Sequence, residues 1–387
     1  MRVKGSEMFD VIVLGVGGMG AATCHELARR GLRVLGLDRF PLVHDRGSSH
    51  GESRIIRKAY FEHPDYVPLL HRAYDLWHEL ELATGRQLLI PTGLLLSGTR
   101  EGETISGARL SAAQHGLELQ DFSASDARKR FPGFDFPLEH DVAYEPGAGT
   151  LLVEACVQAH VEQALKRGAT LRGNEVVLEW SSDGQTVRVK TPEAVYVGQK
   201  LVVTAGAWAN DCLSDIGIQF NVLRKFVGWF PVRSDKYTAT SGMPTYLFET
   251  SSGAFYGFPS FDGTTVKVAE HSRGETVADP LTVDRNCHAS DLERLSAFVK
   301  SHLPGVGTAL SRHSVCLYTM TSDKHFVIDV HPRWKNVVFA AGFSGHGFKF
   351  TPVVGEVLAD LMERGTTTLP IQFLSLARFK SSPFHHR

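Results

Sequence analysis

Hydrophobic and polar positions divide the first forty residues into a strand, a helix and a second strand. Phe9 to Leu14 is a short apolar run rich in β-branched residues, which predicts a buried parallel strand. Ala21 to Arg30 has helical composition with basic residues in its last turn, and Gly31 is placed to end that helix. Arg33 to Leu37 predicts the next strand. The chain therefore opens on a strand–helix–strand unit.

Later segments alternate between helical and strand patterns. Tyr66 to Leu82 carries apolar residues at alternating steps of four and three, which predicts an amphipathic helix packed on a sheet. Residues 222–270 are aromatic and partly of period two, which predicts an antiparallel sheet. Further strands are expected near Leu94 to Leu96, Thr170, Val187, Lys200 to Thr204 and Asn336 to Ala341, and further helices near Ser111 to His115, over Leu151 to Lys166 and from Val353 to Leu361.

These patterns predict an α/β protein of two domains, with α+β organisation overall. A Rossmann-like nucleotide-binding domain opens the chain, an antiparallel-sheet domain is inserted, and the chain then returns to the first domain. The length of 387 residues suits two connected domains. The expected ranges are 8–85, 145–220 and 320–387 for the discontinuous nucleotide-binding domain, and 86–144 and 221–319 for the inserted substrate domain.

Charge and cysteine content narrow the functional class. The formal net charge is −1, which gives no electrostatic case for a nucleic-acid or membrane-surface partner. No apolar run approaches the roughly 18 residues of a membrane span. Met1 to Asp10 lacks the apolar stretch of a secretion signal, so a cytoplasmic location is expected. The cysteines lack the spacing of a zinc site or a redox dithiol, so we expect no metal; they are Cys24, Cys156, Cys212, Cys287 and Cys316.

A glycine-rich turn joins the first strand to the first helix. Gly15, Gly17 and Gly20 match the G-x-G-x-x-G pattern in the required context of strand, turn and helix. Gly15 permits the tight turn, Gly17 lets the backbone approach a pyrophosphate, and Gly20 lets the helix pack on the strand. Asp38, 18 residues beyond Gly20, can accept hydrogen bonds from ribose hydroxyls. The motif does not separate NAD from FAD, but its place near the start and the lack of a second such fingerprint favour FAD.

Four further segments point to one family of enzymes. They are GSSHGESRIIR at 47–57, YGFPSF at 256–261, VCLYT at 315–319 and GFSGHGFK at 342–349. Together with the N-terminal fingerprint and the AGAW turn at 205–208, they resemble the monomeric sarcosine oxidase family. That family includes the N-methyltryptophan oxidases, belongs to the D-amino-acid-oxidase-like flavoenzymes, and is related to pipecolate and fructosyl-amino-acid oxidases. The likeness runs in order from about Phe9 to Leu361.

The resemblance implies that FAD is the cofactor and that it is attached covalently. Cys316 lies in an apolar run where a packed thiol is the alternative, but the matching cysteine of the family forms a thioether to the flavin 8α carbon. His50 and Arg54 match positions against the flavin. The residues expected at the cofactor are Gly15, Gly17, Gly18, Met19, Gly20, Asp38, Arg39, Ser48, Ser53, Arg54, Val176, Ala205, Gly206, Trp208, Cys316, Tyr318, Gly342, Gly345, His346, Gly347 and Lys349.

The same resemblance places a substrate site beside the flavin. Arg57 and Lys349 match the groups that receive the substrate carboxylate, and the planar fork of arginine suits that task because it makes two parallel hydrogen bonds. Residues 54–57, with two arginines around two isoleucines, suit a half-buried helix turn better than an exposed face. The other residues expected on the substrate side are Tyr256, His271, Leu247 and Gly345.

Lys267 has two interpretations. It lies in an alternating strand, Thr265 to Ala269, where a lysine most often faces solvent. In the family the matching lysine is held over the flavin and activates oxygen. A fixed positive charge favours that step, because electron transfer to oxygen makes superoxide, which a cation stabilises.

The resemblance implies oxidation of a secondary amine in an N-alkyl amino acid by hydride transfer to flavin. The imine is then hydrolysed, and oxygen takes the electrons to give hydrogen peroxide. The partners expected are a small amine and O2, and the protein is expected to be a monomer. Ser49 and Leu247 stand where the best-known sarcosine oxidases have histidine and methionine. A bulkier or cyclic amine is therefore an alternative to sarcosine as the substrate. The alternatives are a flavin dehydrogenase, an oxidase of proline, pipecolate or fructosyl amino acids, a non-catalytic flavin-binding protein and, least favoured, an NAD-dependent dehydrogenase.

Overall fold

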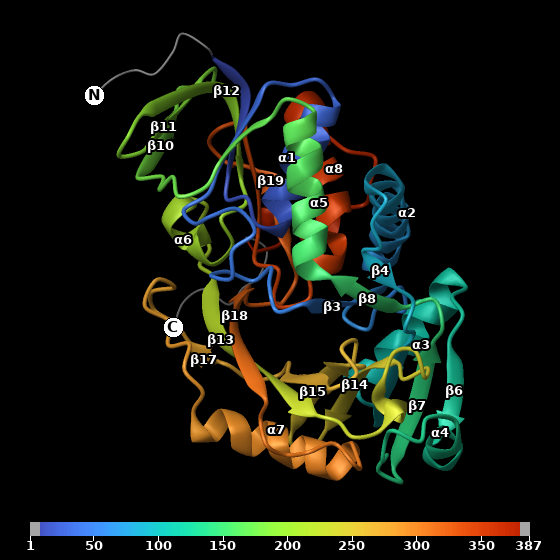
Figure 1. The fold of residues 1–387 in the computed structure, drawn as a ribbon. Helices are drawn as coiled ribbons and strands as arrows, with labels where there is room; N and C mark the ends of the chain where they lie inside the picture. Colours follow the sequence, from blue (N-terminus) through green and yellow to red (C-terminus); the bar gives the residue numbers. More distant parts are fainter. Residues whose placement is uncertain (1–7, 380–387) are drawn as a thin grey trace, which may run out of the picture.

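The computed structural model describes residues 8–379, which form the two lobes seen one above the other in Figure 1. Residues 1–7 of the N-terminal segment and residues 380–387 of the range expected for the nucleotide-binding domain lie outside the described residues. Within residues 8–379, no helix is long and apolar enough to cross a membrane.

The upper lobe is built on an eight-stranded sheet whose central strands are parallel. β1 (Phe9–Leu14) lies between β2 (Val34–Leu37) and β12 (Val195–Val203), and β20 (Val337–Ala341) pairs with β12. β2 and β20 are buried along their whole length, as expected for apolar runs inside a parallel sheet. The other strands are β9 (Thr170–Arg172), β10 (Glu179–Ser182), β11 (Val187–Lys190) and β19 (Val327–Val330). The predicted strand–helix–strand unit is confirmed.

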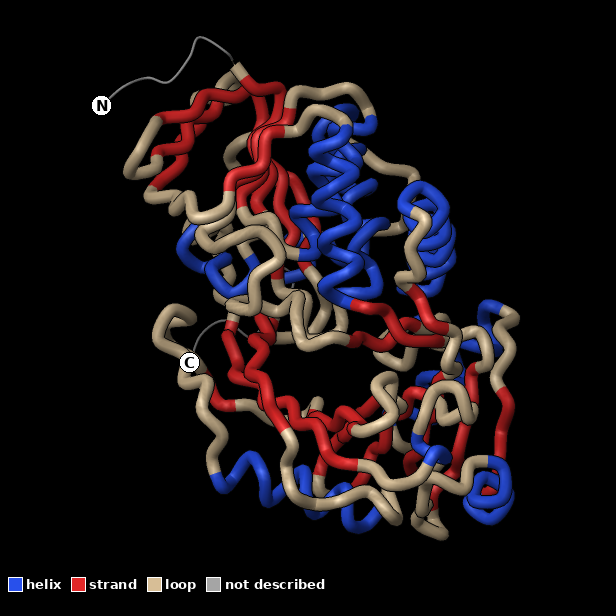
Figure 2. The backbone as a smooth tube through the Cα atoms, viewed as in Figure 1, coloured by secondary structure: helices blue, strands red, loops and turns tan. Residues whose placement is uncertain are grey.

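Three helices cover one face of this sheet (Figures 1 and 2). They are α1 (Gly18–Arg29), α5 (Val153–Lys166) and α8 (Thr351–Arg364). α1 and α8 approach closely because Gly355 faces Ala22, where an added Cβ would lie 2.8 Å from the Ala22 carbonyl carbon. α2 (Val67–Thr84) confirms the predicted amphipathic helix, but its apolar side packs mainly against α8 and not on a sheet as predicted.

The lower lobe holds a nine-stranded, mainly antiparallel sheet. Its long strand β13 (Asn221–Pro231) pairs with β16 (Thr265–Glu270) on one side and β18 (Arg312–Met320) on the other. The predicted antiparallel sheet over 222–270 is therefore confirmed, although one pair, β14 with β5, is parallel. The remaining elements are β5 (Leu94–Thr99), β6 (Gln120–Ser123), β7 (His140–Glu145), β14 (Thr245–Thr250), β15 (Gly253–Phe258), β17 (Glu275–Thr276), α3 (Glu103–His115), α4 (Ala124–Arg130) and α7 (Ala289–His302).

A small three-stranded sheet lies between the lobes (Figure 1). It consists of β3 (Ser53–Ile56), β8 (Gly149–Leu152) and β4 (Leu89–Ile90). The predicted helix turn over residues 54–57 is therefore wrong. Residues 53–56 are extended because their backbone pairs with β8, far along the chain. Because β8 includes Leu151 and Leu152, α5 begins at Val153 and not at the predicted Leu151.

The two large sheets draw their strands from separate parts of the chain. Strands of the eight-stranded sheet all fall within 8–85, 145–220 and 320–387, and those of the nine-stranded sheet within 86–145 and 221–320. The mixed α/β class is confirmed. We retain the predicted domain ranges as a proposal.

Candidate active site

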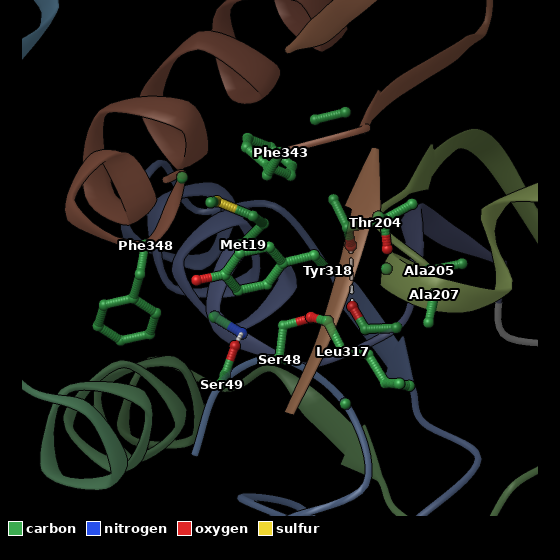
Figure 3. Close-up of a pocket in the computed structure, with 18 of the residues that line it drawn as sticks. Met19, Ser48, Ser49, Thr204, Ala205, Ala207, Leu317, Tyr318, Phe343 and Phe348 are labelled. Atoms are coloured by element: carbon green, nitrogen blue, oxygen red, sulfur yellow. Dashed lines mark hydrogen bonds between the residues drawn. The ribbon is translucent and has the colours of Figure 1, made fainter. Parts of the chain in front are cut away.

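One long cavity begins at the carboxyl ends of β1 and β2 and reaches the antiparallel sheet. Segments far apart in the sequence surround it. Figure 3 shows Ser48 and Ser49 on one side, with Met19, Tyr318 and Phe348 around the space. Such a crevice outside the carboxyl ends of parallel strands is where open α/β sheets bind ligands.

The glycine turn leaves room for a pyrophosphate at the start of α1. Gly15 has φ 86°, and a Cβ there would lie 2.6 Å from the Thr204 carbonyl oxygen. A Cβ on Gly20 would lie 1.7 Å from the Gly15 oxygen, so α1 can follow β1 this tightly only with glycine. A Cβ added at Gly17 would meet only Ser49 Oγ, at 3.8 Å, so the space beside this residue is open. Amide groups in the first turn of α1 that have no intrahelical partner can therefore meet an anion, although the Gly18 amide already donates to Ser49 Oγ.

Asp38 lies at the end of β2 and is held by the backbone. Its Oδ2 accepts a hydrogen bond from the Val16 amide at 2.7 Å, and its Oδ1 accepts one from the Phe40 amide at 2.9 Å. Asp38, Arg39, Ala205, Gly206 and Trp208 line the same end of the cavity. A carboxylate at this position can also accept a hydrogen bond from a ribose hydroxyl.

Two buried polar atoms on the cavity wall test whether FAD fits. Trp208 Nε1 and Thr319 Oγ1 are buried and have no hydrogen-bond partner among the described residues. Buried polar groups are normally paired, so such atoms on a cavity wall indicate a ligand with polar groups of its own. Together with the phosphate cradle and Asp38, they fit a dinucleotide.

Cys316 lies at a corner where three basic groups meet. Arg54 Nη2 is 3.5 Å from the Cys316 sulfur, and His50 Nδ1 is 4.0 Å from it. Burial alone would raise the pKa of the Cys316 thiol, but His50, Arg54 and, more weakly, Lys267 lower this pKa to about 6. The thiolate, which is the nucleophilic form of cysteine, is therefore favoured at neutral pH.

Lys267 is buried, so the solvent-facing alternative is excluded. Its Nζ donates hydrogen bonds to the Gly51 oxygen at 2.5 Å, the Ser53 oxygen at 2.9 Å and Ser53 Oγ at 3.0 Å. The side chain also lies against the Phe258 and Trp229 rings. Burial, and then the nearby Arg54 charge, lower the pKa of Lys267 to about 7.

Two buried cations lie at the substrate end of the cavity. Arg57 Nη2 is 2.5 Å from Glu62 Oε2, and its guanidinium stacks on the rings of Tyr60 and Phe61. Lys349 Nζ donates a hydrogen bond to the His346 oxygen at 2.7 Å. Burial, and next the Arg57 charge, lower the pKa of Lys349 to about 7. Glu62 lies near both cations, and their charges outweigh its burial and lower its pKa to about 2.

An aromatic wall faces these cations. Tyr256, His271 and Tyr318 line the cavity, and His271 Nδ1 lies 3.4 Å from the Tyr318 hydroxyl oxygen. Burial lowers the pKa of His271 to about 3, so its ring is neutral at physiological pH. Gly345 has φ 82°, and a Cβ there would lie 2.1 Å from the Tyr318 ring. Glycine is therefore required for Tyr318 to lie flat against this turn.

Most predicted site residues meet in this one cavity. Arg54, Arg57, Leu247, Tyr256, His271, Tyr318 and Lys349 line it, and so do Gly15, Gly17, Gly18, Met19, Asp38, Arg39, Ser48, Ala205, Gly206, Trp208, Gly342, Gly345, His346 and Gly347. Six predicted residues do not line it: Gly20, His50, Ser53, Val176, Lys267 and Cys316. Four of the six form a buried group around Gly51: His50, Ser53, Lys267 and Cys316. Val176 does not line the cavity, but its neighbours Glu175 and Val177 do.

Several lining residues are missing from the sequence prediction. Glu62 is the most important, because it is the ionic partner of Arg57. Ser49 was noted only as a difference from relatives, yet its Oγ accepts a hydrogen bond from the Gly18 amide at 3.1 Å. The segment around Glu62 has no periodicity, so no local pattern points to it.

The model of the FAD dependent oxidoreductase family matches residues 10–361 of this chain. Monomeric sarcosine oxidase of Streptomyces avermitilis is 41% identical over 98% of this chain and 100% of that protein. Monomeric sarcosine oxidase of Bacillus sp. (strain NS-129) is 40% identical, with 96% of this chain and 97% of that protein covered. N-methyl-L-tryptophan oxidase of Yersinia pseudotuberculosis is 32% identical over 96% of this chain and 100% of its own length.

A solved structure agrees with this relationship. NikD, an unusual amino acid oxidase essential for nikkomycin biosynthesis, superposes in its open form with a TM-score of 0.83 at 27% identity, covering 96% of this chain and 98% of its own. The family resemblance inferred from the motifs is confirmed, and FAD is the cofactor of the matched family. The chain belongs to the FAD-dependent oxidoreductase family, in the group that includes the monomeric sarcosine oxidases and the N-methyl-L-tryptophan oxidases.

Proposed function

We propose that this protein is an FAD-dependent oxidase of secondary amines in N-alkyl amino acids. The observation that carries the proposal is the pair of buried cations, Arg57 and Lys349, which face an aromatic wall in the same cavity as the dinucleotide site. Two buried cations beside a single carboxylate, Glu62, favour the entry of a second carboxylate. The relatives named as sarcosine oxidases and N-methyl-L-tryptophan oxidases support an amino-acid substrate.

The chain contributes orientation and charge to the reaction. When bound, FAD supplies the electron acceptor for the amine and the route to oxygen. Arg57 binds the substrate carboxylate through its planar fork, and Lys349 adds a point charge. Fixing the carboxylate holds the amine and its C–H bond in one orientation, which contributes several kcal/mol to catalysis in favourable cases.

The aromatic wall controls the protonation of the amine. Tyr256, Tyr318 and neutral His271 exclude water from the cavity side that faces the cations. A low-dielectric pocket disfavours an ammonium ion, and so do the charges of Arg57 and Lys349. The residues therefore favour the neutral amine, whose lone pair must assist the loss of hydride.

Lys267 serves the reaction with oxygen in this proposal. Its ammonium is buried and held by three oxygen acceptors, beside Cys316 and Arg54. A fixed cation stabilises the negative charge that develops on oxygen during electron transfer. This role favours an oxidase over a dehydrogenase that passes electrons to a carrier.

We also propose that FAD is attached through Cys316. The low pKa of the Cys316 thiol and its contacts with Arg54 and His50 support this assignment. Acid precipitation of the purified protein will leave the yellow colour in the pellet, and Cys316→Ser will release it to the supernatant. Colour in the wild-type supernatant would exclude the thioether. A variant that moves the cysteine to position 51 would not serve as a control, because Gly51 has φ 89° and a residue with a Cβ would be strained there.

A screen of candidate amines will identify the substrate. Leu247 lines the cavity where the best-known sarcosine oxidases have methionine, so amines larger than sarcosine belong among the substrates to be tested. An oxygen-electrode screen of sarcosine, N-methyltryptophan, proline, pipecolate and fructosyl amino acids will identify the preferred class, and we expect an N-methyl amino acid to be the best. If none of them reduces the bound flavin under anaerobic conditions, the amine-oxidase proposal fails.

We further propose that the protein acts as a cytoplasmic monomer, and gel filtration of the holoenzyme will test its oligomeric state.

A further inference from the structure

The turn at Gly51 and Glu52 has an unusual backbone. Gly51 has φ 89° and Glu52 has φ 71°, so two consecutive residues adopt the left-handed region. For a residue with a Cβ this conformation costs roughly 1 kcal/mol, so other contacts must hold Glu52 in place. Its side chain is on the outside of the turn and more than half exposed. The backbone contacts therefore decide the shape of the turn.

Glu154, in the first turn of α5, accepts hydrogen bonds from both backbone amides of the turn. Its Oε1 accepts a hydrogen bond from the Gly51 amide at 2.7 Å, and its two carboxylate oxygens lie 3.2 and 3.1 Å from the Glu52 amide nitrogen. The neighbouring Val153 amide donates to the Glu52 oxygen at 2.9 Å. A carboxylate is favoured in the first turn of a helix, because the helix dipole is positive there. The turn is thus clamped to a rigid helix.

The other side of this turn holds Lys267. Oxygen atoms of Gly51 and Ser53 accept the three hydrogen bonds of its ammonium group, at 2.5, 2.9 and 3.0 Å. Strand β16 fixes only the lysine backbone, and its four-carbon side chain is flexible. The position of Nζ is therefore set by residues 51–53 and, through them, by the group that holds the turn.

Two further residues contact the side chain of Glu52 and not the backbone of the turn. Glu52 Oε2 accepts a hydrogen bond from Trp229 Nε1 at 3.0 Å, and its Oε1 lies 2.6 Å from Arg312. Those contacts hold the Glu52 side chain, whereas Glu154 holds the two backbone amides. The charged groups that face Lys267 are Arg54, the Cys316 thiolate, Glu154 and Glu52.

We propose that Glu154 is a positioning residue for the oxygen reaction, because it fixes the turn whose oxygen atoms hold the Lys267 ammonium group. The inference rests on the proposed role of Lys267. Within residues 8–379, the Glu154 carboxylate neither lines the cavity nor makes a hydrogen bond to Lys267, and the inference assigns it a task. Loss of this carboxylate should let the turn relax and move Nζ, while the carboxylate-binding end of the cavity stays unchanged.

The test compares four variants of the holoenzyme: Glu154→Ala, Glu154→Gln, Glu162→Ala and Lys267→Met. Glu162 is the matched control, since it is a carboxylate on the same helix whose partners, among the residues that the structure describes, are Arg86 and Gln158 near the surface. Stopped-flow mixing will give the rate constant for reoxidation by O2, and anaerobic mixing with amine will give the rate of reduction. Crystal structures of the Glu154 variants will give the distances from Lys267 Nζ to the Gly51 and Ser53 oxygens.

We expect Glu154→Ala to slow reoxidation on the order of tenfold, with the reduction rate within about twofold of wild type, because a small displacement of a catalytic group costs this much or more. Glu154→Gln keeps one acceptor oxygen and should lose only about threefold. In the crystal structure of Glu154→Ala, Nζ should leave at least one of its three acceptors. Glu162→Ala should match wild type in both half-reactions.

The outcomes separate the inference from the function on which it rests. If Lys267→Met slows reoxidation but both Glu154 variants match wild type, or if Nζ keeps all three contacts, the positioning role is overturned. The positioning role is also overturned if Glu154→Ala slows reduction and reoxidation equally, because an equal loss would show that the substitution disturbs the structure of the site in general. Should Lys267→Met itself reoxidise normally, the proposed oxygen site fails. If Glu154→Ala does not fold, Glu154→Gln carries the same comparison.

Discussion

Arg57→Gln should lower kcat/KM for the best N-alkyl amino acid by about 100- to 1000-fold. That corresponds to roughly 3–4 kcal/mol at about 1.4 kcal/mol per factor of ten. Glutamine cannot make the two parallel charged hydrogen bonds that the guanidinium makes with a carboxylate. It also leaves Glu62, whose side chain is only 12% exposed, without its 2.5 Å ion pair, so a second carboxylate would be repelled. Truncating one member of a buried, hydrogen-bonded charge pair typically costs about 2–5 kcal/mol.

Anaerobic stopped-flow reduction at several amine concentrations will measure this effect. Arg57→Lys is the matched control, because it keeps the charge and loses the fork, and we expect a smaller loss of about tenfold. Reoxidation by O2 should be unchanged in both variants. A non-catalytic flavin-binding protein would show no effect of Arg57→Gln on any measurable activity, and equal activity of Arg57→Gln and wild type would also place the substrate carboxylate elsewhere.

Lys267→Met should slow the reoxidation of the reduced enzyme by about 100-fold or more, the usual range for removing one preorganised electrostatic group. Methionine has a similar length and flexibility but no charge, so it removes the ammonium that three oxygen atoms now hold. The rate of reduction by amine should change little, because the substrate cations Arg57 and Lys349 are untouched. The deciding quantity is the ratio of the rate constant for reoxidation by O2 to the rate constant for reduction by the amine.

Lys225→Met provides the control for the loss of a buried lysine. Lys225 is as buried as Lys267, but it lies on the neighbouring strand β13 and donates to the His271 oxygen at 3.0 Å. We expect its reoxidation rate to stay within about threefold of wild type. If Lys267→Met and Lys225→Met slow reoxidation equally, Lys267 has no special role with oxygen. A normal rate in Lys267→Met would favour a dehydrogenase that uses another acceptor.

Local patterns were enough to predict the dinucleotide half of the site. β1 was predicted at Phe9–Leu14 and is found there, since its apolar run is buried between parallel neighbours. The glycine spacing and Asp38 then follow from chain geometry over about thirty residues. The motif segments led to the family, which the full-length relatives confirm.

Long-range pairing overruled local propensity at residues 53–56. The two arginines and two isoleucines there suit a helix turn in isolation, but the segment pairs with β8, with Ile55 opposite Thr150. Helix and strand differ little in free energy over so short a segment. Backbone pairing with a distant strand therefore decides between them. Local patterns do not predict Glu62 for a related reason: its partner Arg57 is near in sequence, but only the folded cavity brings the two side chains together away from solvent.

The sequence alone determined the βαβ unit, the family and the identity of the chemical groups, because these depend on residue type and on short-range spacing. Only the tertiary structure decided how those groups act on one another. It places the Cys316 sulfur 3.5 Å from Arg54, 262 positions away, and buries Lys267 against Gly51 and Ser53. Charge interactions depend steeply on distance and burial. The low pKa of Cys316 and the lowered pKa of Lys267 are therefore properties of the fold and not of the motifs.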